Sequence, residues 1–113
     1  MAEDLDIRRR ILRVCRRLDA LRFTPGSAGN VSARGTDGTI WITPTGSVLG
    51  EVRMAELARV ALDGSAPTRG RPSSELKVHA AIYRLRPDVG AVVHAHPPAC
   101  VGFALARHDF AKP

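Results

Sequence analysis

Two histidines stand one residue apart in the segment AVVHAHPPAC, residues 91–100. Side chains alternate along a β-strand, so His94 and His96 would project from the same face. Two imidazoles on one face can chelate a divalent ion, and zinc suits a site of histidine and carboxylate ligands. Two exposed histidines at a strand end are a commoner explanation of such a pair. The apolar run before His94 and the two prolines after His96 favour the metal site.

A carboxylate that could join this site comes earlier in the chain, at Glu75. The segment Pro72-Ser73-Ser74-Glu75 has the serines and the early acid typical of a helix N-terminus. In an antiparallel helix–strand unit, the helix start and the end of the following strand meet at one edge. Glu75 could therefore lie near the two histidines as metal ligand, general base or both. Taken alone, Glu75 is explained by its favourable interaction with the helix dipole.

Three loops of small and hydroxyl-bearing residues could hold an anion. They are GSAGN at 26–30, TPTG at 43–46 and PSS at 72–74. Each offers backbone N–H groups with a hydroxyl or amide, and the third stands at a helix N-terminus. Each is by itself typical of a plain turn or cap. Together with the histidine pair, they suggest a phosphate group held beside a metal ion.

Hydrophobic periodicity and turn signals predict the elements that must position these residues. The predicted helices span residues 4–23 and 54–57, the stretch from Ser73–Glu75 to about Arg86, and residues 99–107. The predicted strands span residues 30–34, 39–43, 59–62 and, as a continuous apolar strand expected to be buried, 90–96. The stretch from 63 to 72 is rich in Gly, Pro, Ser and Arg, which indicates an exposed loop.

The other histidines and the aromatic residues fit structural roles better than chemical ones. His79 lies on the inner side of its helix and is interpreted as a core histidine with satisfied hydrogen bonds. Tyr83 falls on the same helical stripe, and Trp41 stands between two isoleucines of a strand, so both are expected in the core. His108 lies in a charged segment and is expected to be exposed.

Length and charge bound the class of protein. The 113 residues, with 44% hydrophobic and 25% charged side chains, predict one small domain over 1–113. The net charge of +6 suggests nucleic acid, but aromatic residues make up only 4%, so a base-stacking platform is not expected. Six arginines fall mostly on the polar side of the first helix: Arg8, Arg9, Arg10, Arg13, Arg16 and Arg17. We expect no nucleic-acid partner, and a basic balance suits an anionic small substrate.

The sequence also predicts a compartment. It contains no long uncharged apolar run and no signal-peptide pattern, so we expect a cytoplasmic protein without a membrane partner. Cys15 and Cys100 both lie in apolar surroundings and form no spaced motif. They are interpreted as two reduced, buried thiols.

Four motifs in order resemble those of the class II aldolase/adducin head family. They are GSAGNVS at 26–32, ITPTG at 42–46, PSSE at 72–75 and HAHP at 94–97. The resemblance runs from about residue 7 nearly to the end of the chain, and the best-known enzymes of the family are similar to L-fuculose-phosphate aldolase. It implies an α/β fold of the α+β type, in which helices flank both faces of a mostly antiparallel sheet in three layers. It also implies a homotetramer with active sites between subunits.

The same resemblance implies a role for each matching residue. The substrate phosphate would be bound by Gly29, Asn30, Thr45, Gly46, Ser73 and Ser74. Zn²⁺ would be held by His94 and His96, while Glu75 would take a proton from the carbon next to the substrate carbonyl and could also touch the metal. Zinc would polarise that carbonyl and stabilise the enediolate of a retro-aldol cleavage.

The resemblance also implies that part of the family's domain is absent. Enzymes of the family are nearly twice this length and take a third histidine ligand, a tyrosine proton donor and further strands from the part beyond residue 113. His108 follows His96 too closely to match that third ligand. We therefore expect a partial domain with weakened zinc binding. Uncovered sheet edges and apolar surface would promote self-association or poor solubility.

Three hypotheses about function stay open. The first is a zinc-dependent aldolase-type lyase that cleaves a sugar phosphate and is inactive if truncated. The second keeps the fold and changes the reaction, to a sugar-phosphate dehydratase (one relative acts on methylthioribulose phosphate) or an oxo-acid phosphate decarboxylase. The third is a non-catalytic interaction module like the adducin head, against which stand the retained His94, His96 and Glu75.

Overall fold

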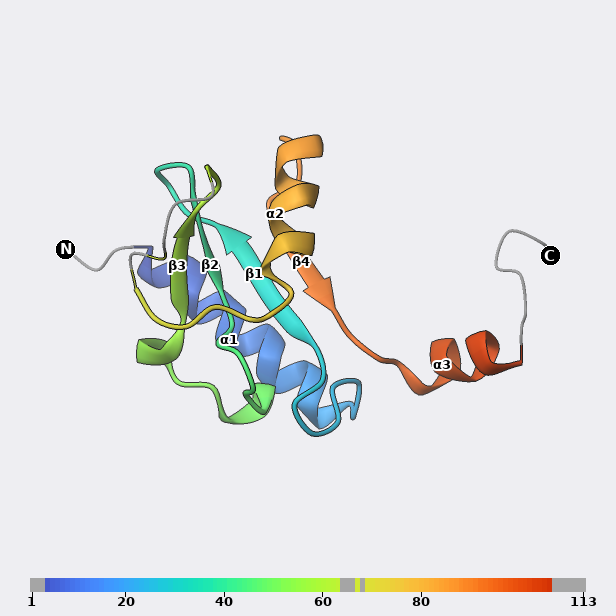
Figure 1. Cartoon of the computed structure of the whole chain (residues 1–113). Coiled ribbons are helices and arrows are strands. Elements are labelled where there is room, and N and C mark those ends of the chain that lie inside the picture. Colours follow the sequence, from blue (N-terminus) through green and yellow to red (C-terminus); the bar gives the residue numbers. More distant parts are fainter. Residues whose placement is uncertain (1–3, 64–66, 68, 107–113) are drawn as a thin grey trace.

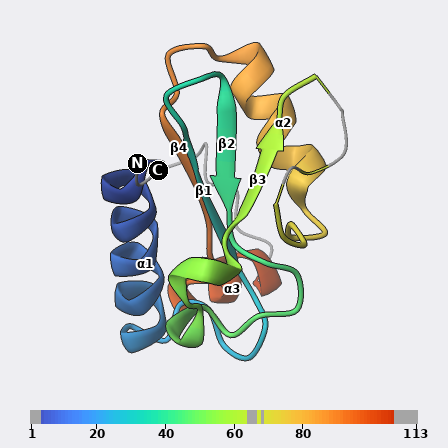
Figure 2. The ribbon, with the colours of Figure 1, turned by 90° about the vertical axis from the view of Figure 1, so that its left-hand side faces the viewer.

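The computed structural model describes residues 4–63, 67 and 69–106 and is built on a four-stranded antiparallel sheet (Figure 1). The strands are ordered β3-β2-β1-β4 and consist of β1 (Asn30–Arg34), β2 (Thr39–Ile42), β3 (Ala58–Ala61) and β4 (Ala91–His94). The α-helices are α1 (Leu5–Ala20), α2 (Leu76–Leu85) and α3 (Pro98–Leu105), and two 3₁₀ turns, η1 (Leu49–Glu51) and η2 (Met54–Glu56), precede β3. Figure 2 shows α1 and α2 on opposite sides of the sheet, which confirms the expected α+β arrangement of three layers.

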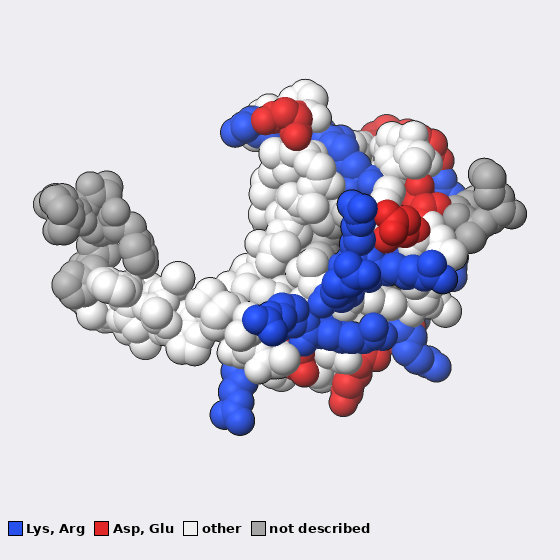
Figure 3. Space-filling model, turned by 180° about the vertical axis from the view of Figure 1, so that it is seen from behind, with Lys and Arg blue, Asp and Glu red and all other residues white. Residues whose placement is uncertain are grey.

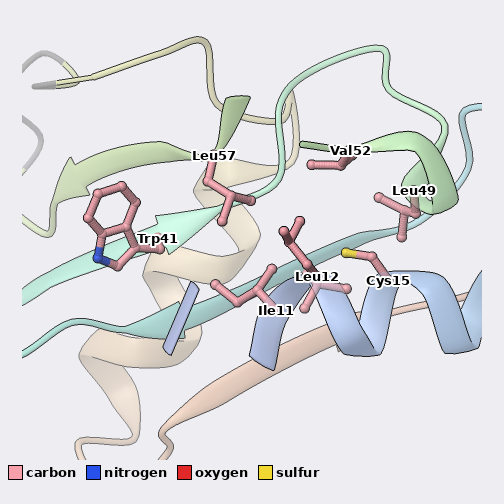
Figure 4. Close-up of a cluster of buried hydrophobic side chains, with 8 residues drawn as sticks. Ile11, Leu12, Cys15, Trp41, Leu49, Val52 and Leu57 are labelled. Carbon is pink, nitrogen blue, oxygen red and sulfur yellow. The ribbon is translucent and has the colours of Figure 1, made fainter. Parts of the chain in front are cut away.

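The α1 side of the sheet holds an apolar core (Figure 4). Alternation along the strands turns Val31 and Trp41 toward α1. The buried members of this cluster are Ile11, Leu12, Cys15, Val31, Trp41, Leu49, Val52 and Leu57. Trp41 is completely buried, and its indole N–H donates to Oδ2 of Asp4 at 2.9 Å. The expectation that Trp41 is structural is therefore confirmed.

The α2 side of the sheet combines apolar packing with buried polar groups. Its apolar members are Ile40, Ile42, Ala58, Val60 and Tyr83. His79 is also buried on this side, at 1% exposure, as predicted for the inner face of the helix. Since Asn30 and Ser32 alternate with Val31, they face α2 rather than α1.

The strand that leads to the histidines differs from the expected buried strand. β4 ends at His94, pairs with β1 alone among the strands described, and lies at the sheet edge with Val93 half exposed. A continuous apolar run is typical of strands covered on both faces, but it does not distinguish a central strand from an edge strand. The prediction of a buried strand through His96 was wrong in both respects.

Helix α3 lies apart from the sheet in Figure 1, and none of its residues is buried. Its apolar side chains Val101, Phe103 and Leu105 are exposed, as is Cys100. The prediction of two buried thiols therefore holds for Cys15 and was wrong for Cys100, because α3 does not pack onto the core.

Basic side chains gather on the face seen in Figure 3, which is the back of the view in Figure 1. Most arginines of α1 are exposed, as its amphipathic pattern predicts. Arg8 is the exception: it is buried, its guanidinium lies 4.6 Å from the centroid of the Trp41 ring, and it donates to the Met54 carbonyl at 3.2 Å. The Arg8 guanidinium is therefore part of the packing around Trp41.

No helix in the described ranges is long and apolar enough to cross a membrane.

Candidate functional site

The loops singled out in the sequence are joined by backbone hydrogen bonds at one end of the sheet. Thr43 binds Val31 twice: its N–H donates to the Val31 carbonyl at 3.0 Å, and its Oγ1 accepts the Val31 N–H at 3.1 Å. The Ser73 N–H donates to the Thr43 carbonyl at 2.9 Å, and the Thr45 N–H donates to the Arg71 carbonyl at 3.0 Å. The start of β1 and the segments 43–45 and 71–73 are therefore held side by side. Thr43 belongs to the motif ITPTG, but its sequence context did not predict this role.

Gly29 is required where β1 begins. Its φ is +82°, and a Cβ atom there would lie 2.4 Å from Cγ2 of Thr24 and 2.9 Å from the His94 carbonyl oxygen. A larger residue would therefore push the strand carrying His94 away from β1. Asn30, the next residue, is buried and pairs directly with His94 in the register of β1 and β4.

The remaining candidate phosphate ligands lie in the two neighbouring loops. Thr45 and Gly46 are exposed in the turn after β2, and Gly46 has a φ of +66°. Ser73 is buried, and its Oγ accepts the Glu75 N–H at 3.2 Å, as expected of a serine at a helix start. Ser74 is exposed. Their roles toward a phosphate remain predictions.

Glu75 and His94 come together as the antiparallel helix–strand geometry predicts. Oε2 of Glu75 lies 3.2 Å from Nδ1 of His94, and both side chains are partly exposed. Glu75 directly precedes the first residue of α2, instead of standing in the first turn as expected. A carboxylate beside an imidazole at an accessible edge can accept a proton or bind a cation.

His96 lies beyond the end of β4 but beside His94. Its backbone N–H donates to the Phe23 carbonyl at 2.6 Å, which fixes the chain after the strand to the segment that follows α1. The rings of His94 and His96 have centroids 4.9 Å apart, at an angle of 34°. The two imidazoles are thus neighbours, as expected from alternation, although the strand itself stops at His94.

The donor chemistry of these three side chains fits a zinc ion. Two ligands at about 2.0–2.2 Å from one tetrahedral zinc lie roughly 3.3 Å from each other. The 3.2 Å between Oε2 of Glu75 and Nδ1 of His94 matches that separation, with the His96 ring next to His94. Within the described part of the chain, however, no group of three or more His, Cys, Asp or Glu side chains is gathered closely enough to hold a metal. His108 lies outside the described residues.

His79 lies directly behind this site. Its Nδ1 is 2.6 Å from Oγ of Ser32, and its Nε2 is hydrogen-bonded to Oδ1 of Asn30. Burial lowers the pKa of His79, and His94 acts in the same direction, while Glu75 opposes them. The interpretation of His79 as a satisfied core histidine is confirmed.

The bond between His79 and Asn30, one of the candidate phosphate ligands, was not predicted from the sequence. A signal for this was present in the motif GSAGNVS. It places Asn30 and Ser32 two residues apart, on one face of a strand.

The chain is similar in sequence to known proteins of one family. The sequence model of the class II aldolase and adducin N-terminal domain matches residues 9–113. The chain is 39% identical over 89 residues to the L-fuculose phosphate aldolase of Methanocaldococcus jannaschii, covering 79% of this chain and 48% of that protein. It is 42% identical over 106 residues to the 3-oxo-tetronate 4-phosphate decarboxylase of Cupriavidus necator, covering 94% of this chain and 48% of that protein.

Solved structures show the same relationship. The crystal structure of YgbL from Klebsiella pneumoniae superposes with a TM-score of 0.85 at 31% sequence identity, covering 90% of this chain and 49% of that chain. The present chain thus spans about half the length of the proteins it matches. With the family model covering nearly all of its sequence, the chain belongs to the class II aldolase and adducin N-terminal domain family.

Proposed function

We propose that this chain carries the metal and phosphate side of a zinc-dependent lyase that cleaves a phosphorylated sugar by retro-aldol chemistry. The observation that carries the proposal is the contact of 3.2 Å between Glu75 and His94, at the end of the sheet where the three loops converge. Proteins named L-fuculose phosphate aldolase among the relatives support the substrate class.

The phosphate would bind to the loops around Asn30, Thr45 and Ser74. Thr45, Gly46 and Ser74 are exposed and can offer hydroxyl and backbone N–H donors to an anion. Gly29 allows the backbone to pass close to β4, and Ser73, which is buried, orients the turn into α2. The net charge of +6 favours approach of an anionic substrate.

Glu75 would act as the proton acceptor, because its carboxylate is partly exposed and lies at the edge of the same loops. His94, His96 and Glu75 would hold the zinc ion. When bound, zinc would supply polarisation of the substrate carbonyl. The chain's own contribution is to place a carboxylate and two imidazoles within reach of a phosphate anchored by the loops.

A second candidate reaction is decarboxylation of an oxo-acid phosphate. It is favoured by the relative from Cupriavidus necator, which matches a larger share of this chain at higher identity than the aldolase does. Release of carbon dioxide from 3-oxo-tetronate 4-phosphate, compared with aldehyde release from L-fuculose phosphate, distinguishes the two reactions. Assembly as a cytoplasmic homotetramer belongs to the same proposal, and light scattering coupled to size exclusion tests it.

The deciding experiment is the zinc content of protein purified without chelators. We expect close to one zinc per chain, lost in His94→Ala and in Glu75→Gln. Glu51→Gln is the matched control, because it removes an exposed carboxylate at the end of the 3₁₀ turn η1. Zinc at background level in the unaltered chain, or equal loss in Glu51→Gln, would contradict the proposed metal site.

A further inference from the structure

A cavity of about 510 Å³ lies between α2 and β3, the edge strand opposite β4. Its most deeply buried lining consists of Ile40 of β2, Val60 of β3 and Ala80 of α2, which are at most 7% exposed. Leu62 and Leu76, both partly buried, complete the apolar surface. Cavities of about 300–1,000 Å³ with mainly apolar linings are typical of small-molecule sites. This cavity is therefore large enough for a small apolar ligand.

The spacing of residues on α2 explains why the cavity is there. Residues four apart share one face of a helix, and the row formed by Leu76, Ala80 and Arg84 lines the cavity. The neighbouring row contains His79, whose Nδ1 lies 2.6 Å from Oγ of Ser32 in β1. Polar bonds thus hold α2 against β1, while the row on the β3 side leaves space at the small side chain of Ala80.

Two basic side chains line the cavity, and none of the described residues that line it is acidic. Nε and Nη2 of Arg84 donate to the Leu62 carbonyl at 2.9 and 2.6 Å, which joins α2 to the residue after β3. Lys77 is exposed and lies seven residues before Arg84, roughly 10 Å along the helix axis. None of the ion pairs within the described ranges includes Lys77. Its stem can line the cavity while its ammonium group receives an anion at the rim.

A second apolar groove, of about 370 Å³, lies between α1 and β4 and also contains two arginines. There, however, Arg10 is paired with Asp6 at 3.2 Å. Arg34 donates to the backbone carbonyls of Val89 and Tyr83 at 2.6 and 2.7 Å. The cavity between α2 and β3 is larger and has the unpaired ammonium group of Lys77 at its rim. It is therefore the better site for a ligand that combines an apolar body with a negative charge.

We propose that the cavity between α2 and β3 binds a small aliphatic carboxylate, such as a medium-chain fatty acid. Its hydrocarbon chain lies against Val60 and Ala80, and its carboxylate pairs with Lys77. The described lining contains no aromatic ring and, besides Lys77 and Arg84, no polar side chain, so burial recognises the chain and charge recognises the carboxylate. This site goes beyond the proposed lyase function and does not depend on zinc.

Octanoate is the probe, and 1-octanol and octylammonium are its neutral and cationic counterparts of equal chain length. Titration of each into the whole ¹⁵N-labelled chain, followed by backbone amide NMR, reports both affinity and location. We expect octanoate to shift the amides of residues 58–62 and 76–84. It should bind about 2- to 5-fold more tightly than octanol, the gain of one exposed ion pair, and octylammonium should bind most weakly. Repeating the titration with a chelator should leave the octanoate affinity unchanged, which separates this site from the proposed metal site.

Variants separate recognition of the charge from recognition of the chain. Lys77→Gln should remove the preference for octanoate over octanol. Arg16→Gln, which removes an exposed charge from α1, is the matched control and should leave that preference unchanged. Ala80→Leu should displace about two methylene groups of the ligand from the cavity and weaken octanoate and octanol alike by roughly 10-fold. If Ala80→Leu does not fold, Ala61→Leu fills the same cavity from β3 and must have the same effect.

Three results would overturn the proposal. The first is equal affinity for octanoate and octylammonium, because the site would then not select an anion. The second is an octanoate affinity that the cavity-filling variants leave unchanged. The third is a set of shifted amides confined to α3, whose exposed apolar side chains would then be the site of binding.

Discussion

The two faces of the sheet bury side chains of different chemistry. On the α1 side, α1 and the connection between β2 and β3 enclose an apolar cluster around Trp41. On the α2 side, the apolar residues share the interior with Ser32, His79 and Asn30, whose side chains are hydrogen-bonded to one another. Among the described residues, the polar side chains of the α2 side reach the candidate metal ligand His94 through Asn30.

This difference separates stability from positioning. Apolar contacts are non-directional, so the α1 side can stabilise the domain without specifying the orientation of any polar atom. Buried hydrogen bonds are directional and costly to leave unmade, so the α2 side fixes orientations at the site. Substitutions on the α1 side should therefore mainly lower the free energy of unfolding, whereas substitutions on the α2 side should also change the candidate site.

Trp41→Ala should produce the largest loss of stability. The side chain is completely buried, bonds to Asp4 and lies against the Arg8 guanidinium, so its removal leaves a cavity and separates several partners. Replacement of a buried Trp by Ala costs about 3–5 kcal/mol in the free energy of unfolding. Urea denaturation followed by circular dichroism measures the loss.

The matched control is Phe103→Ala on α3, where the aromatic side chain is 49% exposed. We expect a change within about 0.5 kcal/mol for this exposed site. Similar losses in both variants would show that α3 packs onto the domain in solution and that the comparison of the two faces is incomplete.

Ser32→Ala should have an intermediate effect, larger than that of Tyr83→Phe. Ser32 links two buried groups, so its removal leaves both the Tyr83 hydroxyl and Nδ1 of His79 without their partner. Each buried group left unsatisfied costs about 1–3 kcal/mol. Tyr83→Phe removes only the hydrogen bond to Ser32 and leaves the His79–Asn30 bond in place. It should therefore cost about 1 kcal/mol in the free energy of unfolding.

The same denaturation assay measures this pair of variants. The ¹⁵N NMR spectrum of the His94 imidazole, assigned with His94→Ala, sharpens the comparison of the two faces. We expect Ser32→Ala to change the ¹⁵N imidazole spectrum of His94. Trp41→Ala should leave that spectrum unchanged under conditions in which the variant stays folded. A His94 spectrum that responds to Trp41→Ala as strongly as to Ser32→Ala would remove the distinction between the faces.

Local patterns predicted the elements of this fold and the residues that face its core, whereas the three layers were implied by the family resemblance. Alternation placed Trp41 in the core, and helical spacing placed His79 and Tyr83 on the inner side of α2. The prediction that residues 90–96 form a buried strand was wrong, because an apolar run does not reveal the position of a strand in the sheet. That position depends on long-range pairing, which here puts β4 at the edge.

The candidate site was predicted in part for the same reason. The approach of Glu75 to His94 follows from the direction of the chain through α2 and β4, which is a local property. The bond between His79 and Asn30 depends on how α2 is placed against β1, across 49 residues of sequence. No spacing rule encodes that contact, so His79 was recognised as buried but not as a partner of the site.

Asp4 gives the α1 side one interaction that depends on pH. The hydrogen bond from Trp41 holds the pKa of the Asp4 carboxyl below its usual value of 3.8. Because the pKa is depressed in the folded state, the stabilisation is complete well above pH 3.8 and is lost as the pH falls through the folded-state pKa. Asp4→Asn should therefore reduce the acid sensitivity of the free energy of unfolding.

Asparagine tolerates the left-handed backbone of Asp4, whose φ is 50°, so the substitution changes the charge with little backbone strain. Denaturation between about pH 2 and 7 measures the difference between the two chains, which should shrink toward low pH, where both side chains are neutral. A constant difference across that range would mean that the Asp4 charge does not stabilise the fold.

The two cysteines give the smallest effect, a difference in reactivity without a change in stability. Burial raises the pKa of the Cys15 thiol to about 12, so at neutral pH almost no thiolate is present, and the side chain is enclosed in the core on the α1 side. Cys100 is exposed on α3. Since the thiolate is the reactive form and must be reached by the reagent, iodoacetamide should modify Cys100 and spare Cys15 in the native chain.

Mass spectrometry of the alkylated protein, with and without urea, counts the modified thiols. One modified thiol in native protein and two in urea are expected. Two in native protein would mean that the core on the α1 side opens readily, and none would mean that α3 is covered in solution, as it would be if copies of this chain associate through it.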